Sequence, residues 1–154
     1  MTASIDLTRR ALLAAAFAVA GCGAAADPRP LVEVWKSPRC GCCKDWIAHL
    51  EANGFRVRWH NSGNTDVRAR LGLPLELGAC HTARVGGYAI EGHVPAREVH
   101  RLLKEKPRAT GLAVPAMPVG SPGMDGPEYG SRRDPYDVLL VLGDKRAAIY
   151  QPYR

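Results

Sequence analysis

Stretches of alternating apolar and polar residues border a stretch with helical spacing near the start of the chain. Residues 31–35 are apolar except for one glutamate, a composition that favours a strand. From residue 43 to 52, apolar side chains recur three and four positions apart, which predicts an amphipathic helix ended by Asn53 and Gly54. Residues 55–59 alternate apolar and basic side chains, as a strand with one buried face does. The pattern therefore predicts a strand–helix–strand unit.

A short helix, a hairpin and a longer helix are predicted next. Residues 65–71 begin with a threonine suited to a helix N-cap, and Gly72 ends this short helix. Two glycines between the strand-like segments 82–85 and 88–91 indicate a two-residue hairpin turn. Residues 95–104 begin with a proline and carry apolar residues at helical spacing, which predicts a helix.

The remaining third of the chain has a different character. Residues 107–130 are dense in proline and glycine, which predicts an irregular loop. Residues 136–142 and 146–150 predict a closing hairpin. Because a Cys-x-x-Cys motif lies at the turn between the first strand and helix, this order of elements predicts an α/β fold. We expect a single thioredoxin-like (glutaredoxin-like) domain over residues 27–154, with an added C-terminal loop and β-hairpin.

The first 26 residues have the layout of a bacterial secretory signal. Arg9 and Arg10 precede an apolar run over residues 11–20, which is too short for a permanent membrane helix, and small residues follow. Two cleavage sites stay open: a lipobox-like sequence would make Cys22 a lipid anchor, whereas residues 24–26 form an ordinary signal-peptidase site. The arginine pair also fits both a twin-arginine and a general secretory signal. We expect a periplasmic protein, either free or membrane-anchored as a lipoprotein.

Length and charge narrow the classes of function. A chain of 154 residues holds one ordinary domain with a single core. Its formal net charge is +6, but the lysines and arginines are scattered rather than clustered with aromatic residues. We therefore expect a solvated basic surface and no nucleic-acid partner.

Four cysteines of the mature chain supply the candidate chemistry. Cys40, Cys42 and Cys43 crowd one turn at the expected helix start, where backbone amides and the helix dipole favour thiolates. In thioredoxin-like folds the loop before the hairpin lies against this turn, so Cys80 is expected to face the other three. Soft sulfur ligands select Cu(I), Zn(II) or iron–sulfur centres.

Charge favours several Cu(I) ions among these metals. Four thiolates around one Cu(I) leave a net charge of about −3 in a partly desolvated pocket, whereas several Cu(I) ions bridged by sulfur neutralise most of it. A structural zinc site usually draws on two spaced cysteine pairs, and here three ligands lie within four residues. Two disulfides are the plain alternative in an oxidising periplasm, although Cys42 and Cys43 are too close to bond readily to each other.

Histidines and methionines extend the candidate ligand set. His81 adjoins Cys80, and His93 precedes the last predicted helix, so both are candidate copper ligands. Met117 and Met124 lie on the Pro/Gly-rich loop; their thioethers bind Cu(I), but methionines in such loops also fill gaps in packing. The other histidines are expected on the surface: His49, His60 and His100.

Three segments of the chain carry distinctive motifs. They are residues 35–43 (WKSPRCGCC), residues 79–96 with ACHTA and EGHVPA, and residues 114–124 with VPAMP and GSPGM. In these motifs the chain resembles the CopG-like family, long catalogued as domain of unknown function 411. The resemblance implies a periplasmic protein of bacterial copper resistance, with a thioredoxin-like fold, a cysteine-bound copper centre and redox handling of copper. It puts these residues in the metal site: Cys40, Cys42, Cys43, Cys80, His81 and His93.

We therefore predict a periplasmic copper-binding protein that holds Cu(I) in a multinuclear copper–thiolate centre and interconverts Cu(I) and Cu(II). Metal binding is favoured over classical turnover, although a copper oxidoreductase stays open. Expected partners are copper ions and other periplasmic copper-handling proteins. If this chain acts as a copper chaperone, it passes copper to such proteins. The alternative is a periplasmic thiol–disulfide oxidoreductase using Cys40 and Cys43. His81 counts against it, because thioredoxin-like oxidoreductases resemble one another in having a proline at that place.

Overall fold

One seven-stranded sheet and three α-helices make up the part of the chain that the computed structural model describes, residues 27–154. The strands are β1 (Leu31–Lys36), β2 (Arg56–His60), β3 (His81–Val85), β4 (Tyr88–Glu91), β5 (Gly111–Ala113), β6 (Tyr136–Val141) and β7 (Ala147–Tyr153). The helices are α1 (Gly41–Ala52), α2 (Thr65–Arg70) and α3 (Ala96–Glu105), with short 3-10 turns η1 (Leu75–Leu77) and η2 (Pro127–Tyr129). The predicted signal peptide, with the alternative lipid site Cys22, lies outside the described residues. Within residues 27–154, no helix has both the length and the apolar character needed to cross a membrane.

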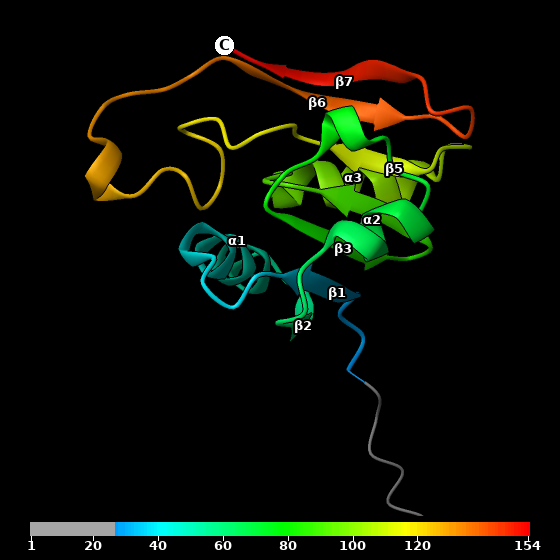
Figure 1. Ribbon diagram of the computed structural model, residues 1–154, viewed down its shortest axis with the longest axis horizontal. Helices are drawn as coiled ribbons and strands as arrows, with labels where there is room; N and C mark the ends of the chain where they lie inside the picture. The colour runs from blue at the N-terminus through cyan, green and yellow to red at the C-terminus, as the bar shows by residue number, and fades with distance from the viewer. Residues whose placement is uncertain (1–26) are drawn as a thin grey trace, which may run out of the picture.

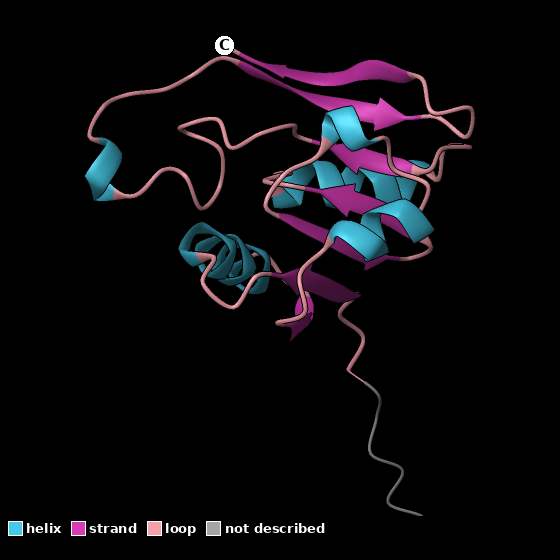
Figure 2. Ribbon diagram, viewed as in Figure 1, coloured by secondary structure: helices cyan, strands magenta, loops and turns pink. Residues whose placement is uncertain are grey.

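The strands follow the order β2-β1-β3-β4-β5-β6-β7 (Figure 1). Strands β1 and β2 are parallel and joined through α1, and β4 and β5 are parallel and joined through α3. All other neighbouring strands are antiparallel. The mixed α/β class predicted from the sequence is confirmed, and the helices lie on both faces of the sheet (Figure 2).

Helices α1 and α3 pack on one face of the sheet around the main core. Trp46 of α1 and Leu102 of α3 are fully buried there with Ile90 of β4. The indole N–H of Trp46 also donates a hydrogen bond of 2.9 Å to the carbonyl of Val94, which ties α1 to the residues before α3. Ala89, the neighbour of Ile90 in β4, faces the other way and belongs to a smaller cluster beneath the chain that follows α2.

A strand lies within the segment 107–130 that was predicted to be irregular. Strand β5 pairs with β4 on one side and β6 on the other, so the predicted C-terminal hairpin extends the main sheet. Three residues are too few to show a period, and the surrounding prolines and glycines indicated only a loop. A Cβ at Gly111 would collide with the backbone of Ala89, so a glycine is needed where β5 approaches β4.

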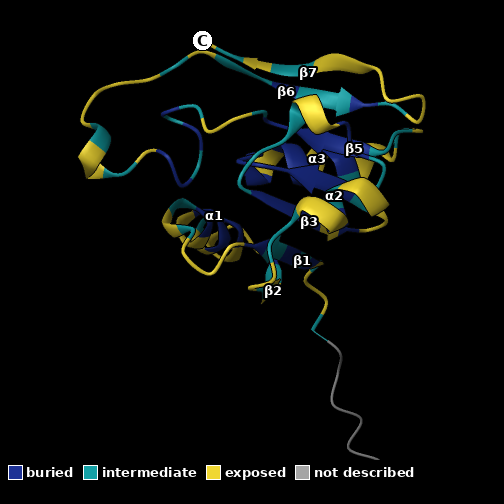
Figure 3. Ribbon diagram, viewed as in Figure 1, coloured by how far each residue is buried: buried dark blue, intermediate teal, exposed yellow. Residues whose placement is uncertain are grey.

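After β5 the chain returns to the N-terminal end of α1 through residues 114–124, here called the return loop (Figure 1). A Cβ at Gly123 would lie 2.6 Å from the carbonyl oxygen of Cys42 and 2.7 Å from the amide nitrogen of Trp46. The loop backbone therefore contacts the first turns of α1. Much of this loop is buried although it has no regular structure (Figure 3).

Candidate metal centre

The four predicted cysteines lie together at the N-terminus of α1. Cys40 is the N-cap residue, Cys42 and Cys43 lie in the first turn, and Cys80 directly precedes β3. The Sγ of Cys80 is 3.5 Å from that of Cys43 and 3.8 Å from that of Cys42. All four sulfur atoms lie within 4.8 Å of one another. The loop before the hairpin therefore lies against the Cys-x-x-Cys turn, as expected from the sequence.

Two of these cysteines are oxidised. Cys40 and Cys43 form a disulfide, whereas Cys42 and Cys80 are free thiols. Cys42 nevertheless stays close to the bridge, with its Sγ 3.6 Å from that of Cys40. Of the two disulfides that the alternative required, one is present. A site with four thiolates requires reduction of this bond.

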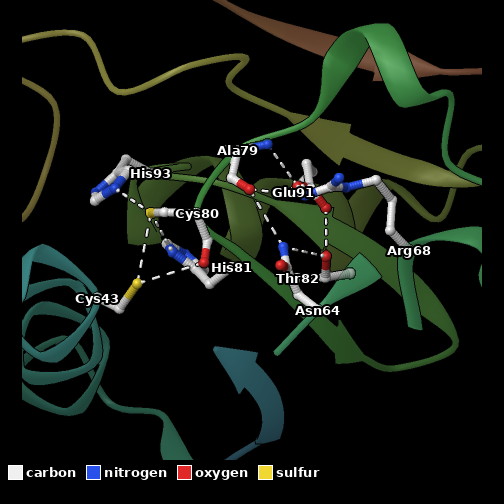
Figure 4. A network of polar contacts seen from close by, with 9 residues as sticks. All are labelled: Cys43, Asn64, Arg68, Ala79, Cys80, His81, Thr82, Glu91 and His93. Atoms are coloured by element: carbon white, nitrogen blue, oxygen red, sulfur yellow. Dashed lines mark hydrogen bonds and ion pairs between the residues drawn. The ribbon is translucent and has the colours of Figure 1, made fainter. Parts of the chain in front are cut away.

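His81 and His93 adjoin the sulfur group through Cys80 (Figure 4). The Sγ of Cys80 lies 3.3 Å from Nδ1 of His81 and 3.1 Å from Nε2 of His93. Both imidazoles are fully buried. Nδ1 of His93 donates a hydrogen bond of 2.8 Å to the carbonyl of Pro122 on the return loop. Nε2 of His81 is buried without a hydrogen-bond partner, and its ring lies 4.2 Å from that of Trp46.

A buried polar network holds the backbone next to Cys80 (Figure 4). The carboxylate of Glu91 accepts hydrogen bonds from the N–H of Ala79 at 2.7 Å, from Nε of Arg68 at 2.9 Å and from the hydroxyl of Thr82 at 2.6 Å. Arg68 and Asn64 donate to the carbonyl of Ala79, at 2.7 Å and 3.2 Å. The two peptide groups that flank Ala79 are therefore both held by hydrogen bonds. We call these five residues the Glu91 network.

Sequence reasoning missed this network. Three of its members lie in α2, β3 and β4, and Asn64 and Ala79 lie just before α2 and β3. All are common residue types, and no motif or period links Asn64 or Arg68 to the cysteines. The one available signal was the predicted hairpin, because its register pairs Thr82 with Glu91 and places two polar residues beside Cys80.

Burial controls the protonation of the residues around Cys80. Burial and the neighbouring Cys42 raise the pKa of the Cys80 thiol to about 12, so a metal ion must displace its proton. Burial lowers the pKa of both His81 and His93, which keeps the imidazoles neutral as metal ligation requires. Burial also raises the pKa of Glu91, against the opposing effects of Arg68 and the other donors of the network.

The two methionines differ in their surroundings. Met124 is buried in the return loop, and its sulfur accepts a hydrogen bond of 3.5 Å from the hydroxyl of Tyr129. Met117, on the same loop, is 47% exposed. Among the histidines expected on the surface, His49 is half-buried and accepts a hydrogen bond of 3.0 Å from the N–H of Ala96, at the start of α3.

The donor set fits a soft metal ion. Four sulfur atoms lie within reach of one another, and sulfur ligands favour Cu(I) and Zn(II) over hard cations. The two neutral imidazoles add borderline nitrogen ligands at the Cys80 side. No carboxylate takes part in either ligand group found among the described residues.

Comparisons with known proteins agree with this chemistry. A family model described as "Protein of unknown function, DUF411" matches residues 77–124, which include Cys80, both histidines and the return loop. No curated protein matches the chain. A solved structure named copper resistance protein copG, form 2, is 43% identical, with a TM-score of 0.76, and the match covers 82% of this chain and 99% of that one. Form 1 of the same protein is 44% identical, with a TM-score of 0.75, over 81% and 98% of the two chains. Identity at this level over nearly the whole of those structures shows that the chain belongs to the CopG family, DUF411.

Proposed function

We propose that this chain is a periplasmic copper-binding protein of copper resistance. In its reduced state, Cys40, Cys42, Cys43 and Cys80 hold Cu(I), as several ions that share bridging sulfurs. The observation that carries the proposal is that all four sulfur atoms lie within 4.8 Å of one another. The solved relatives named as copper resistance proteins support copper as the metal.

Electrostatics supports several ions rather than one. Cys43 is fully buried and Cys80 is partly buried, so uncompensated thiolates there are costly. Sulfur atoms 3.5 to 3.8 Å apart can each contact more than one Cu(I), and each added ion cancels one negative charge. Bound copper would supply one-electron chemistry between Cu(I) and Cu(II), and handing it on to other periplasmic copper proteins fits the same site.

The fold and location are part of the same proposal. A thioredoxin-like fold is supported by the order of β1, α1 and β2 followed by the β3–β4 hairpin and α3. It is supported further by the position of Cys80 beside the Cys-x-x-Cys turn. Export to the periplasm, with or without lipid at Cys22, is supported by the signal-like sequence of residues 1–26.

The test is anaerobic Cu(I) loading of the fully reduced chain in competition with a Cu(I) chelator of moderate affinity. We expect more than one Cu(I) bound per chain. Cys80→Ser should bind fewer ions, because Cys80 contacts both Cys42 and Cys43. Cys22→Ser is the matched control and should bind as much Cu(I) as the parent. Failure of the reduced parent to retain any Cu(I) against the chelator would contradict the proposal.

The disulfide favours a second candidate, a thiol–disulfide oxidoreductase that uses Cys40 and Cys43. Against it stands Cys42, whose thiol lies 3.6 Å from the sulfur of Cys40 and is able to exchange into the bridge. Disulfide reductase or isomerase activity measured in a Cys42→Ser, Cys80→Ser variant decides between the two. Activity that survives both substitutions would favour the oxidoreductase.

A further inference from the structure

Strand β2 is the last strand at one end of the sheet, so one of its edges is open (Figure 1). The N–H of Arg56 donates to the carbonyl of Pro30, which shows that the backbone groups of Arg56 and Arg58 point toward β1. The backbone groups of Val57 and Trp59 therefore point away from the sheet, and no other described strand pairs with them. Such a row of unpaired N–H and C=O groups is a template for an added strand.

A groove with a volume of about 400 Å³ lies between α1 and this open edge. Its apolar lining includes Ile47 of α1 and the indole of Trp59, which is 51% exposed. Val57 faces the same side of the sheet as Trp59 and packs against the main core. Because side chains alternate along a strand, every second side chain of an added strand would enter the groove beside Trp59.

The groove carries more positive than negative charge. Lys36 is only 2% exposed, and its ammonium donates to the carbonyl of Ser37 at 3.2 Å and to Oδ1 of Asn61 at 3.0 Å. No carboxylate within residues 27–154 pairs with this ammonium. The exposed side chains that line the groove include one further lysine, Lys44, and one carboxylate, Glu51. A buried ammonium without a carboxylate favours an anionic occupant.

The opposite face of β2 is also basic. Arg58 is exposed and forms no ion pair with another residue of the described chain. Its cross-strand neighbour Glu33 instead contacts His60 at 3.0 Å and Arg84 at 3.1 Å. Pairing of β2 with the β2 strand of a second copy would add the arginines of one copy to those of the other, and like charges across strands repel. An acidic strand is the complementary partner.

We propose that the open edge of β2 binds an extended segment of a partner protein, in which acidic residues facing Arg58 alternate with apolar residues facing Trp59. Main-chain hydrogen bonds to Val57 and Trp59 supply affinity, and the alternating side chains supply specificity. Pro38 lines the same groove two residues before Cys40, so the bound segment holds its protein close to the cysteine turn. This docking surface goes beyond the proposed function and requires no bound metal.

The probe is the peptide acetyl-Glu-Val-Glu-Leu-Glu-Val-Glu-amide, added to the metal-free full chain with Cys22→Ser and the disulfide closed. We expect saturable binding, a blue shift of tryptophan emission that Trp59→Phe abolishes, and slower hydrogen exchange at the amides of Val57 and Trp59. Arg58→Glu should weaken binding roughly ten-fold. Arg146→Glu is the matched control, because exposed Arg146 precedes β7 at the other end of the sheet and should leave binding unchanged.

A peptide of the same composition with its glutamates in one block separates strand addition from attraction by net charge. The proposal is overturned if the block peptide binds as well as the alternating one, or if the alternating peptide shows no saturable binding up to about 1 mM. Protection of the same two amides by dimerisation without peptide would assign the edge to a second copy and overturn it too. Each of these results leaves Cu(I) binding by the reduced chain intact, and loss of Cu(I) binding leaves this surface intact.

Discussion

Replacing Glu91 by alanine tests whether the buried network positions Cys80. Glu91 is fully buried and accepts three hydrogen bonds, one of them from the guanidinium of Arg68, which is itself 11% exposed in its side chain. The substitution leaves the Arg68 charge without its carboxylate and the N–H of Ala79 without an acceptor. Removing one partner of a buried ion pair costs about 3–5 kcal/mol. For a domain of this size that corresponds to a melting temperature lower by roughly 10–20 °C.

The assay is thermal unfolding of the metal-free chain followed by circular dichroism, paired with Cu(I) competition on the reduced chain. Cu(I) affinity should fall together with stability, because the backbone of Ala79 directly precedes Cys80. Glu91→Gln is the conservative variant. Its amide oxygen can still accept from Arg68 and Ala79 and its NH₂ can donate to Thr82, so it should recover most of the Cu(I) affinity.

Glu105→Ala provides the control, because Glu105 is exposed on α3, where it pairs with Arg101 and accepts a hydrogen bond from the hydroxyl of Tyr150, and should change the melting temperature little. The reasoning is refuted if Glu91→Ala melts within a few degrees of the parent, or if it melts far lower while its Cu(I) affinity is unchanged. The second result would mean that the network stabilises the fold without positioning Cys80.

Three further predictions concern the surroundings of the site. Burial lowers the pKa of the His49 imidazole below its usual 6.5. The stabilising contribution of neutral His49 is therefore complete above pH 6.5 and is lost as the pH falls from there toward the pKa of the folded state. The free energy of unfolding of His49→Gln, measured in urea, should depend less on pH over this range. Gly123→Ala should destabilise by at least about 1–2 kcal/mol in chemical denaturation, because φ at Gly123 is +83° and the new Cβ meets the carbonyl of Cys42. Leu102→Ala, which empties a fully buried position under α3, should cost about 2–5 kcal/mol by the same measurement.

Elements with enough residues to show a period could be predicted from the sequence. The apolar residues of α1 recur at helical spacing, and Trp46, Ile47 and Leu50 are all buried as that spacing required. Strand β5 could not be predicted, because its three residues owe their conformation to pairing with β4 and β6, which are distant in sequence. The C-terminal hairpin was recognised, but its continuity with the main sheet depends on that short strand.

The candidate sulfur ligands could also be predicted from the sequence, because cysteine is rare and the turn before α1 gathers three of them. The contacts that orient the other candidate ligands could not be predicted. His93 is fixed by the carbonyl of Pro122, and Cys80 is held through the peptide groups of Ala79. Backbone groups carry no residue-specific signal, so only the folded chain shows which of them face the site.

Cys80 is the one residue common to the two candidate ligand groups among the described residues. With the disulfide closed, two neutral imidazoles and the Cys42 thiol lie beside Cys80 as unbridged candidate ligands; reduction of the disulfide frees the sulfurs of Cys40 and Cys43 to join them. Because the thiol of Cys80 has a pKa of about 12, an ion bound in either group must first displace the same proton. Metal binding that uses Cys80 should therefore strengthen as the pH rises, together with the loss of a proton from every other cysteine that binds as a thiolate. The oxidation state of Cys40 and Cys43 determines how many sulfurs can join Cys80.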